Sequence, residues 1–130
     1  MRQAFLDFLA TDGGLSPRTI DSVRELLRSP PEPIGSIAFS YGMVTGADID
    51  LILADQRRTH RRFGEIAMAM GMLTKAQVET LVRVQQVRAA TETAEALVLS
   101  GAASIDDMAT LLGRFLMRAS SGVAATSEAR

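Results

Sequence analysis

The densest group of charged side chains in this 130-residue sequence is basic. It consists of Arg57, Arg58, His60, Arg61 and Arg62. Guanidinium groups form charge-assisted hydrogen bonds to phosphate oxygens, so the segment could hold a diphosphate. Exposed cations at a helix end also complement the helix dipole without binding a ligand. We favour this second interpretation for Arg57 and Arg58, and the first for Arg62, which stands just ahead of Gly64.

Gly64 belongs to a repeat that keeps one constant offset along the sequence. Residues 34–45 recur as 63–74, and the correspondence continues as far as the pair Gln56 and Gln85. The identical pairs are Gly35/Gly64, Ile37/Ile66, Ala38/Ala67, Gly42/Gly71, Met43/Met72, Thr45/Thr74, Ala47/Ala76 and Gln56/Gln85. A fixed period with matching glycines and apolar positions indicates a duplicated supersecondary unit that buries its apolar face against its neighbour.

Two of these pairs could contact a ligand. Gly35 and Gly64 open short helices, where free backbone N–H groups can face a phosphate or a guanine edge and a flat ligand can approach closely. Close packing between helical hairpins is the alternative. Gln56 and Gln85 end equivalent helices, and each amide could pair with a base edge or bridge neighbouring hairpins. The sequence leaves both questions open.

The elements that position these residues are helices. Ser16 and Pro17 start a helix expected to run to about Arg28, and the prolines of the linker 30–33 end it. Each central unit then gives a short helix, a glycine turn and a longer helix that begins at Thr45 or Thr74, the latter with a capping-box pattern. No segment shows sustained period-two alternation, so we predict an all-α fold without a sheet.

The outer segments resemble degenerate copies of the same unit, so we expect four tandem short-helix/long-helix hairpins, two of them regular and two degenerate. The expected organisation is a degenerate N-terminal hairpin (1–29), a proline-rich linker (30–33), two regular repeats (34–88), a degenerate capping hairpin (89–119) and a flexible tail (120–130). Leu6 and Ala94 replace the first glycine in the outer copies, so the role of Gly35 and Gly64 is expected of the central pair alone.

Two apolar sets lie outside these pairs. We expect the methionines to fill the core, because their spacing is helical. They are Met43, Met68, Met70 and Met72. A second set could supply an apolar patch for self-association. It comprises Val98, Leu99, Phe115 and Leu116.

Composition excludes several functions. The net charge of −1 argues against a nucleic-acid binder, and the lack of cysteine excludes thiol catalysis and disulfides and fits a reducing cytoplasm. No apolar run approaches the roughly 20 residues that span a bilayer, and Asp7 lies where a signal peptide would be apolar, so we expect a cytoplasmic protein without membrane insertion. With His60 as the only histidine, and no nucleophile beside a base, we expect neither an enzyme nor a metal site.

Residues 33–56 and 62–85 resemble the paired motifs of the N-terminal domain of type II secretion and type IV pilus assembly ATPases, in the variant called MshEN. That pattern runs Arg-Leu-Gly, an apolar pair, Gly, an apolar pair, spaced leucines and a closing Gln, and five residues separate its two 24-residue motifs. Residues 57–61 give the same spacing, but Pro33 replaces the first arginine, and Ile34 and Phe63 replace leucine. No Gly-x-x-x-x-Gly-Lys-Ser/Thr motif is present, so we expect a stand-alone module without an ATPase motor.

In this family the paired motifs can bind cyclic di-GMP, and other members dock a protein partner at the inner membrane. The resemblance implies that a nucleotide would contact Ile34, Gly35, Ile37, Gly42, Val44, Gln56, Arg62, Phe63, Gly64, Ile66, Gly71, Leu73 and Gln85. It implies a non-catalytic regulatory module that binds cyclic di-GMP between its central repeats, without another cofactor, and passes the signal to a protein partner. The alternative is a nucleotide-independent adaptor for a secretion, pilus or motility system. Pro33 favours the adaptor, whereas Arg62 and the paired glycines and glutamines favour the nucleotide.

Overall fold

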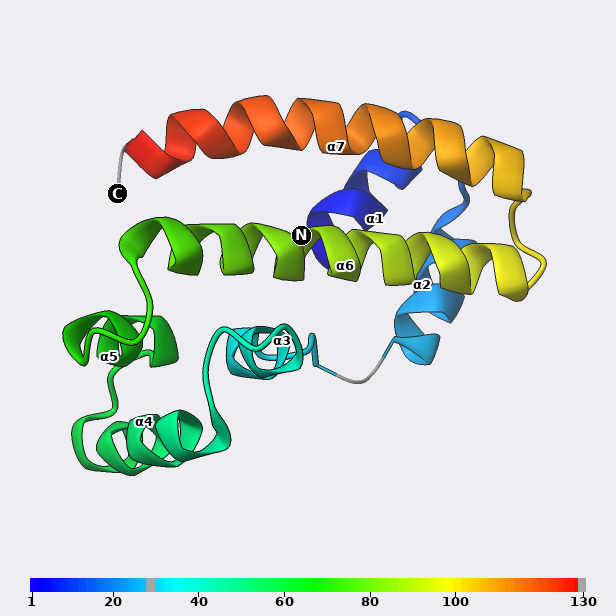
Figure 1. The fold of residues 1–130 in the computed structure, drawn as a ribbon. Helices are drawn as coiled ribbons and strands as arrows, with labels where there is room; N and C mark the ends of the chain where they lie inside the picture. The colour runs from blue at the N-terminus through cyan, green and yellow to red at the C-terminus, as the bar shows by residue number, and fades with distance from the viewer. Residues whose placement is uncertain (28–29, 129–130) are drawn as a thin grey trace. The chain divides into compact units, whose positions relative to one another are not determined.

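All regular secondary structure in the described residues is α-helical (Figure 1). The computed structural model describes residues 1–27 and 30–128, with side chains as far as residue 119. Its helices are α1 (Arg2–Thr11), α2 (Pro17–Leu26), α3 (Ile34–Ser40), α4 (Gly46–Thr59), α5 (Phe63–Ala69), α6 (Lys75–Leu99) and α7 (Ile105–Glu128). The prediction of an all-α fold is therefore confirmed.

The chain divides into two compact units. We call Pro31–Gln85 the central unit, and Met1–Pro30 together with Gln86–Arg130 the terminal unit. Each unit has a hydrophobic cluster of its own, and the two clusters share no residue. Helix α6 contributes its first part to the central unit and the rest to the terminal unit.

In the central unit α3 and α5 lie above α4, and Figure 1 looks nearly along the axes of these two short helices. The start of α5 is separated from the start of α3 by the same number of residues that separates Gly64 from Gly35. The starts of α4 and α6 have the same separation. The buried side chains are mainly aliphatic and come from matching positions of these elements. They are Ile37, Ala38, Val44, Ile52, Ile66, Ala67, Leu73 and Leu81.

The two short helices end in the same way. Gly42 and Gly71 have φ angles of 70° and 73°, in the left-handed region that glycine adopts without a steric cost. The N–H of Gly42 donates to Phe39 O at 3.0 Å, and the N–H of Gly71 donates to Met68 O at the same distance. Each bond gives a donor to a carbonyl at the end of a short helix, and the glycine turn reverses the chain toward the following longer helix.

Threonine side chains start the longer helices. Thr45 Oγ1 accepts a hydrogen bond from the N–H of Asp48, and the Asp48 carboxylate accepts one from the N–H of Thr45, each at 3.0 Å. Thr74 and Gln77 make the same exchange at 3.1 and 2.8 Å. The capping box predicted at Thr74 is thus confirmed, and α4 has one as well.

Thr45→Ala is expected to lower the free energy of unfolding by about 1 kcal/mol, because the N–H of Asp48 loses its acceptor at the helix start. Chemical denaturation followed by circular dichroism measures this. Thr80→Ala is the matched control: Thr80 is exposed and its hydroxyl donates to Ala76 O within α6, so this change is expected to be neutral or slightly stabilising. Equal losses for both variants would contradict a capping role.

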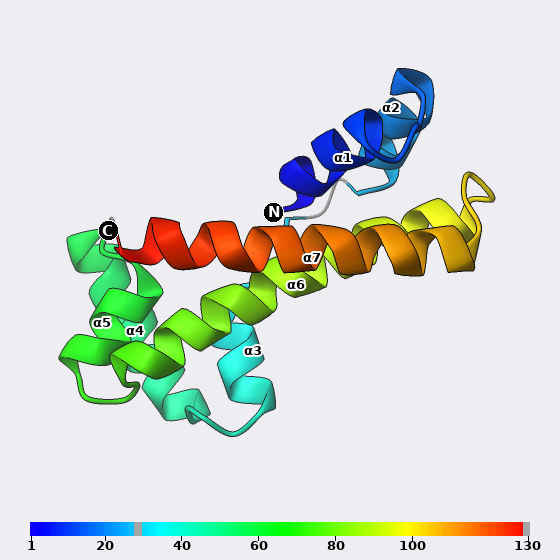
Figure 2. The ribbon, with the colours of Figure 1, turned by 90° about the horizontal axis from the view of Figure 1, so that it is seen from above.

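The terminal unit is built around three phenylalanines. Phe5 and Phe8 from α1 lie 5.0 and 5.6 Å from Phe115 of α7, measured between ring centroids. In this unit the last turns of α6 and the first turns of α7 run side by side in opposite directions on either side of the turn at Gly101 (Figures 1 and 2). The remaining buried residues complete a core that all four helices share. They are Leu6, Leu9, Ile20, Val23, Ala90, Ala94, Leu97 and Met108.

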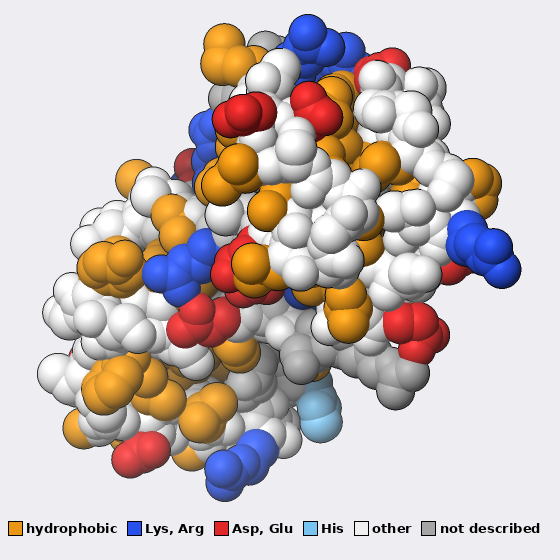
Figure 3. Space-filling view, turned by 90° about the vertical axis from the view of Figure 1, so that its right-hand side faces the viewer, with side chains coloured by type: hydrophobic (Ala, Val, Ile, Leu, Met, Phe, Trp, Pro, Cys, Tyr) orange, Lys and Arg blue, Asp and Glu red, His pale blue; other side chains and the backbone are white. Residues whose placement is uncertain are grey.

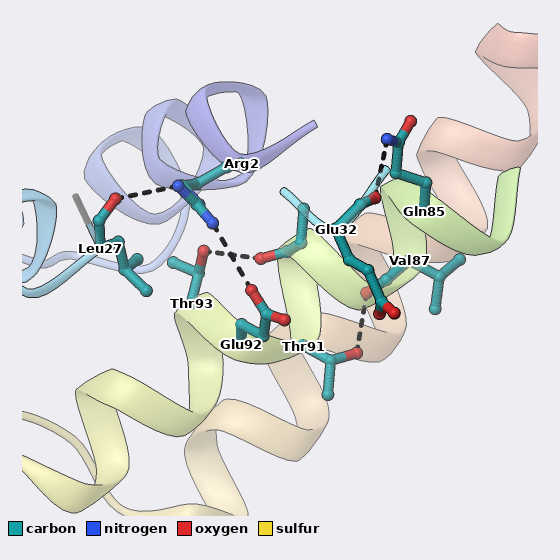
Figure 4. Close-up of polar contacts among 9 residues, drawn as sticks. Arg2, Leu27, Glu32, Gln85, Val87, Thr91, Glu92 and Thr93 are labelled. Atoms are coloured by element: carbon teal, nitrogen blue, oxygen red, sulfur yellow. Dashed lines mark hydrogen bonds and ion pairs between the residues drawn. The ribbon is translucent and has the colours of Figure 1, made fainter. Parts of the chain in front are cut away.

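Arginines secure both ends of α1. Arg2 donates from Nη1 to Leu27 O at 2.9 Å and forms an ion pair with Glu92 at 3.5 Å (Figure 4). At the other end, Arg118 of α7 lies 5.0 Å above the Phe8 ring and donates to the Asp12 carboxylate at 2.7 Å. These contacts connect α1 to three other parts of the terminal unit: the end of α2, α6 and α7.

The structure differs from several sequence-based expectations. Helix α6 crosses the boundary expected between residues 88 and 89 without a break, because neither glycine nor proline interrupts residues 75–99. Helix α7 continues to Glu128, so the backbone is helical through most of the expected tail 120–130, and residues 129–130 lie outside the described residues. Helix α2 ends at Leu26, and residue 28, where we expected its end, also lies outside them.

Candidate ligand-binding seam

The N-terminal ends of α3 and α5 contact each other reciprocally. A Cβ atom added to Gly35 of α3 would lie 2.9 Å from the ring atoms Cε2 and Cζ of Phe63. A Cβ atom added to Gly64 of α5 would lie 3.6 Å from Cδ1 of Ile34. Each helix therefore places its first side chain over the glycine of the other, as in a contact with two-fold symmetry. We call Ile34, Gly35, Phe63 and Gly64 the α3–α5 seam.

Close packing explains both seam glycines. In addition to Ile34, Gly64 faces α6, where a Cβ would lie 2.7 Å from Cγ1 of Val78. That distance is too short for any real Cβ contact, and the Cγ1 methyl belongs to a stiff β-branched side chain. The sequence left open ligand contact or close packing as the role of these glycines, and the distances support close packing.

The residues before the two helices have the same backbone but different side chains. Pro33 has φ −62° and ψ 149°, and Arg62 has φ −72° and ψ 148°. Neither helix has a side-chain cap, in contrast to α2 and α4. Arg62 is exposed, and within the described ranges no carboxylate or hydrogen-bond acceptor engages its guanidinium. It is thus available to a ligand at one end of the seam.

The other cations of the basic segment are used differently. Arg58 pairs with Asp55 one turn earlier on α4, and Arg61 pairs with Glu65 at 4.0 Å. His60 has φ 58° and ends α4, with its N–H donating to Gln56 O at 2.8 Å. These residues form a solvated helix end, the interpretation that we favoured for Arg58.

Gln85 bridges two segments of the central unit. Its Nε2 donates to Glu32 O, just ahead of α3, at 3.0 Å (Figure 4). The sequence left open base recognition or a bridge between neighbouring hairpins, and this bond connects Gln85 to the expected linker 30–33. Gln56, at the equivalent position on α4, is half-buried. Of the two glutamines, Gln85 is therefore the one that holds the chain leading into the seam.

The remaining positions that the family pattern implies lie outside the seam, in the core of the central unit or in the turns after α3 and α5. Four aliphatic side chains are at most 5% exposed and belong to the core of the central unit, so only their backbone could face a ligand. They are Ile37, Val44, Ile66 and Leu73. Gly42 and Gly71 lie in the exposed turns after α3 and α5, where their role is a left-handed backbone.

An exposed apolar set at the ends of the short helices was not expected from the sequence. Phe39 and Tyr41 are 54% and 70% exposed, and their equivalents Met68 and Met70 are 36% and 42% exposed. Our expectation that all four methionines fill the core was wrong for these two, whereas Met43 and Met72 do pack against the cluster. Identity between the repeats was not a reliable signal: the buried pairs Ile37/Ile66 and Ala38/Ala67 are identical, but the buried pair Ile52/Leu81 shares only apolar character, as the exposed pairs do.

The apolar patch expected from Val98, Leu99, Phe115 and Leu116 is not continuous. Phe115 is 6% exposed and lies in the core, whereas Leu99 is 78% exposed. Figure 3 faces the end of the terminal unit where α6 turns into α7, and there hydrophobic side chains reach a surface on which charges of both signs are interspersed.

No described helix combines the length and apolar character that crossing a bilayer requires.

Comparisons with protein-family models, with curated proteins and with solved structures find no match to this chain. The motif positions and the geometry of the seam are therefore the features that bear on function.

Proposed function

We propose that this chain is a non-catalytic regulatory module that binds cyclic di-GMP at the α3–α5 seam and passes the signal to a protein partner in the cytoplasm. The observation that carries the proposal is the reciprocity of the seam, in which Ile34 covers Gly64 and Phe63 covers Gly35. Cyclic di-GMP consists of two identical halves. A site made of two like helix ends offers related contacts to both of them.

This proposal includes a duplicated architecture. Helices α3 and α4 form one unit, and α5 with the first part of α6 forms the other, with equivalent helix starts, glycine turns and threonine caps at one constant offset. The duplication explains why glycines and first side chains meet across a common axis. The turn after α6, at Gly101, also has a positive φ angle and supports a flanking hairpin of the same kind. In the turn after α1 the positive φ is at Gly14, one residue after the position that lies two repeat lengths before Gly71.

One side chain of the seam and one beside it suit a guanine nucleotide. Arg62 can donate two parallel hydrogen bonds to a phosphate or to O6 and N7 of guanine. Phe63 is half-buried, so one part of its ring covers Gly35 while the remainder can stack on a base. Pro33 offers no cation to the second half of the ligand, so binding through this pair is asymmetric.

Arg62→Ala is expected to weaken the binding of cyclic di-GMP about tenfold, which corresponds to about 1.4 kcal/mol, because one charge-assisted contact is lost. Isothermal titration calorimetry of the full chain measures this. Arg18→Ala is the control, because Arg18 is also exposed but belongs to α2 in the terminal unit. Absence of binding by the parent chain would refute the proposed function. Equal weakening by both variants would refute the assignment of Arg62.

A second candidate function is a nucleotide-independent adaptor for a secretion, pilus or motility component. The exposed apolar side chains Phe39, Tyr41, Met68 and Met70 favour it, because apolar groups at equivalent places of two repeats suit one extended protein ligand. A photo-crosslinking amino acid at Tyr41 is then expected to capture one discrete protein in cells, and the same group at Thr80 on α6 is expected to capture none. Identical labelling from both positions would contradict this candidate.

A further inference from the structure

Helix α4 presents a solvent-facing side that the proposed nucleotide site does not use. Ile52 is fully buried and marks the inner side of the helix. The opposite side, at helical spacing, consists of exposed residues. They are Ala47, Asp50, Leu51, Ala54, Arg57 and Arg58. We call these six residues the α4 outer face.

The middle of the α4 outer face is apolar. Leu51 is 57% exposed and has the small side chains of Ala47 and Ala54 one turn away on either side. At the equivalent positions of α6, in the second repeat, Thr80 and Arg83 replace Leu51 and Ala54. The corresponding helix is therefore polar where α4 is apolar, so the exposed leucine is not a requirement of the repeat itself.

Charges of opposite sign stand at the two ends of this face. Asp50 lies toward the start of α4, and Arg57 lies two turns later on the same side, about 10.5 Å along the axis. Neither side chain has an ion-pair or hydrogen-bond partner within the described residues. Arg58, beside Arg57, is 75% exposed despite its pairing with Asp55.

We propose that a second copy of this chain packs antiparallel on the α4 outer face. A two-fold axis near Ala54 would place each Asp50 opposite Arg57 of the other copy, so that one surface complements itself in charge. The small Ala54 would let the two helices approach closely, with Leu51 of each copy beside the axis. Antiparallel helix dipoles favour the same orientation. An acidic partner would leave Asp50 opposed to a like charge, and a basic one would do the same to Arg57.

One face of a 14-residue helix is smaller than the roughly 800 Å² per partner of a stable interface. The dimer is therefore expected to be weak and concentration-dependent. Because exposed ion pairs contribute to it, association is also expected to weaken as the salt concentration rises.

Sedimentation velocity of the full chain from about 10 μM to about 1 mM at low salt tests the proposal. The parent chain is expected to shift from monomer to dimer. Asp50→Arg and Arg57→Asp are each expected to raise the dissociation constant at least about tenfold, and the double variant is expected to restore it to within about threefold, because the exchanged charges again face each other. Leu51→Glu is expected to abolish the dimer.

Thr80→Glu introduces the same negative charge on the α6 counterpart and is expected to leave association unchanged. All variants are at exposed positions, and circular dichroism establishes that each one folds. A parent chain that remains monomeric throughout, a double variant that stays as weak as the single ones, or an equal effect of Thr80→Glu would each overturn the proposal. Cyclic di-GMP titration of Leu51→Glu separates the two ideas, because nucleotide binding is expected to survive in this variant.

Discussion

Phe5→Ala is expected to lower the free energy of unfolding of the terminal unit by about 3–5 kcal/mol. Phe5 is fully buried, and its ring lies 5.0 Å from Phe115 and 6.4 Å from Phe8 between centroids. Truncation removes these aromatic contacts and leaves a cavity between α1 and α7 that the stiff helices can close only in part. Denaturant titration followed by circular dichroism measures the loss.

The same variant tests whether the two hydrophobic clusters are energetically separate. Because they share no residue, hydrogen exchange in Phe5→Ala is expected to rise in α1, α2 and α7 while α3 to α5 stay protected. Leu99→Ala, at a position 78% exposed, is the control and is expected to change stability by less than about 0.5 kcal/mol. A uniform loss of protection across both units would contradict this separation.

Turns and helix starts of the central unit could be predicted from the sequence because they depend on few residues. The positive φ angles of Gly42 and Gly71 follow from the absence of a Cβ atom. The caps at Thr45 and Thr74 depend on side chains that reach the backbone of their own helix within its first turn. In both cases the competing conformations are local, and the residue type decides between them.

Which apolar side chains are buried and which are exposed could not be predicted in the same way. We expected Met68 in the core and Phe115 in an apolar surface patch, yet Met68 is exposed and Phe115 is in the core. Periodicity identifies a face but not the element that covers it, and that choice depends on contacts far apart in the chain. The unbroken α6 is a different case. The absence of glycine and proline from residues 75–99 was a local signal for it, but aligning the repeats placed a boundary between residues 88 and 89.

The candidate site shows the same limit. Matching glycines at positions 35 and 64 indicated a shared role, but the sequence could not decide between packing and ligand contact. The answer depends on Phe63 for Gly35 and on Val78 for Gly64, and each of these contacts joins two different helices. Arg62 was identified from the motif, but only the structure indicates that its guanidinium is not engaged by a neighbouring carboxylate among the described residues.

Gly64→Leu is expected to lower the free energy of unfolding of the central unit by about 3 kcal/mol. A Cβ at this position would lie 2.7 Å from Val78 Cγ1, and the longer leucine side chain would also meet Ile34. Since Val78 has a single favoured rotamer in a helix, α5 would have to move away from α6, which opens the core around Ile66. Thermal and denaturant unfolding of the purified variant measure the effect.

Gly113→Leu is the matched control. Gly113 lies in α7, and a Cβ added there would meet no atom within 4 Å, so leucine is expected to be neutral or to stabilise by up to about 0.8 kcal/mol through helix propensity. Equal destabilisation by both variants would show that the Val78 contact is not the cause. Because Gly64→Leu disturbs the core, a loss of cyclic di-GMP binding in this variant would report on folding. Arg62→Ala, at an exposed position outside the core, is therefore the variant that tests recognition itself.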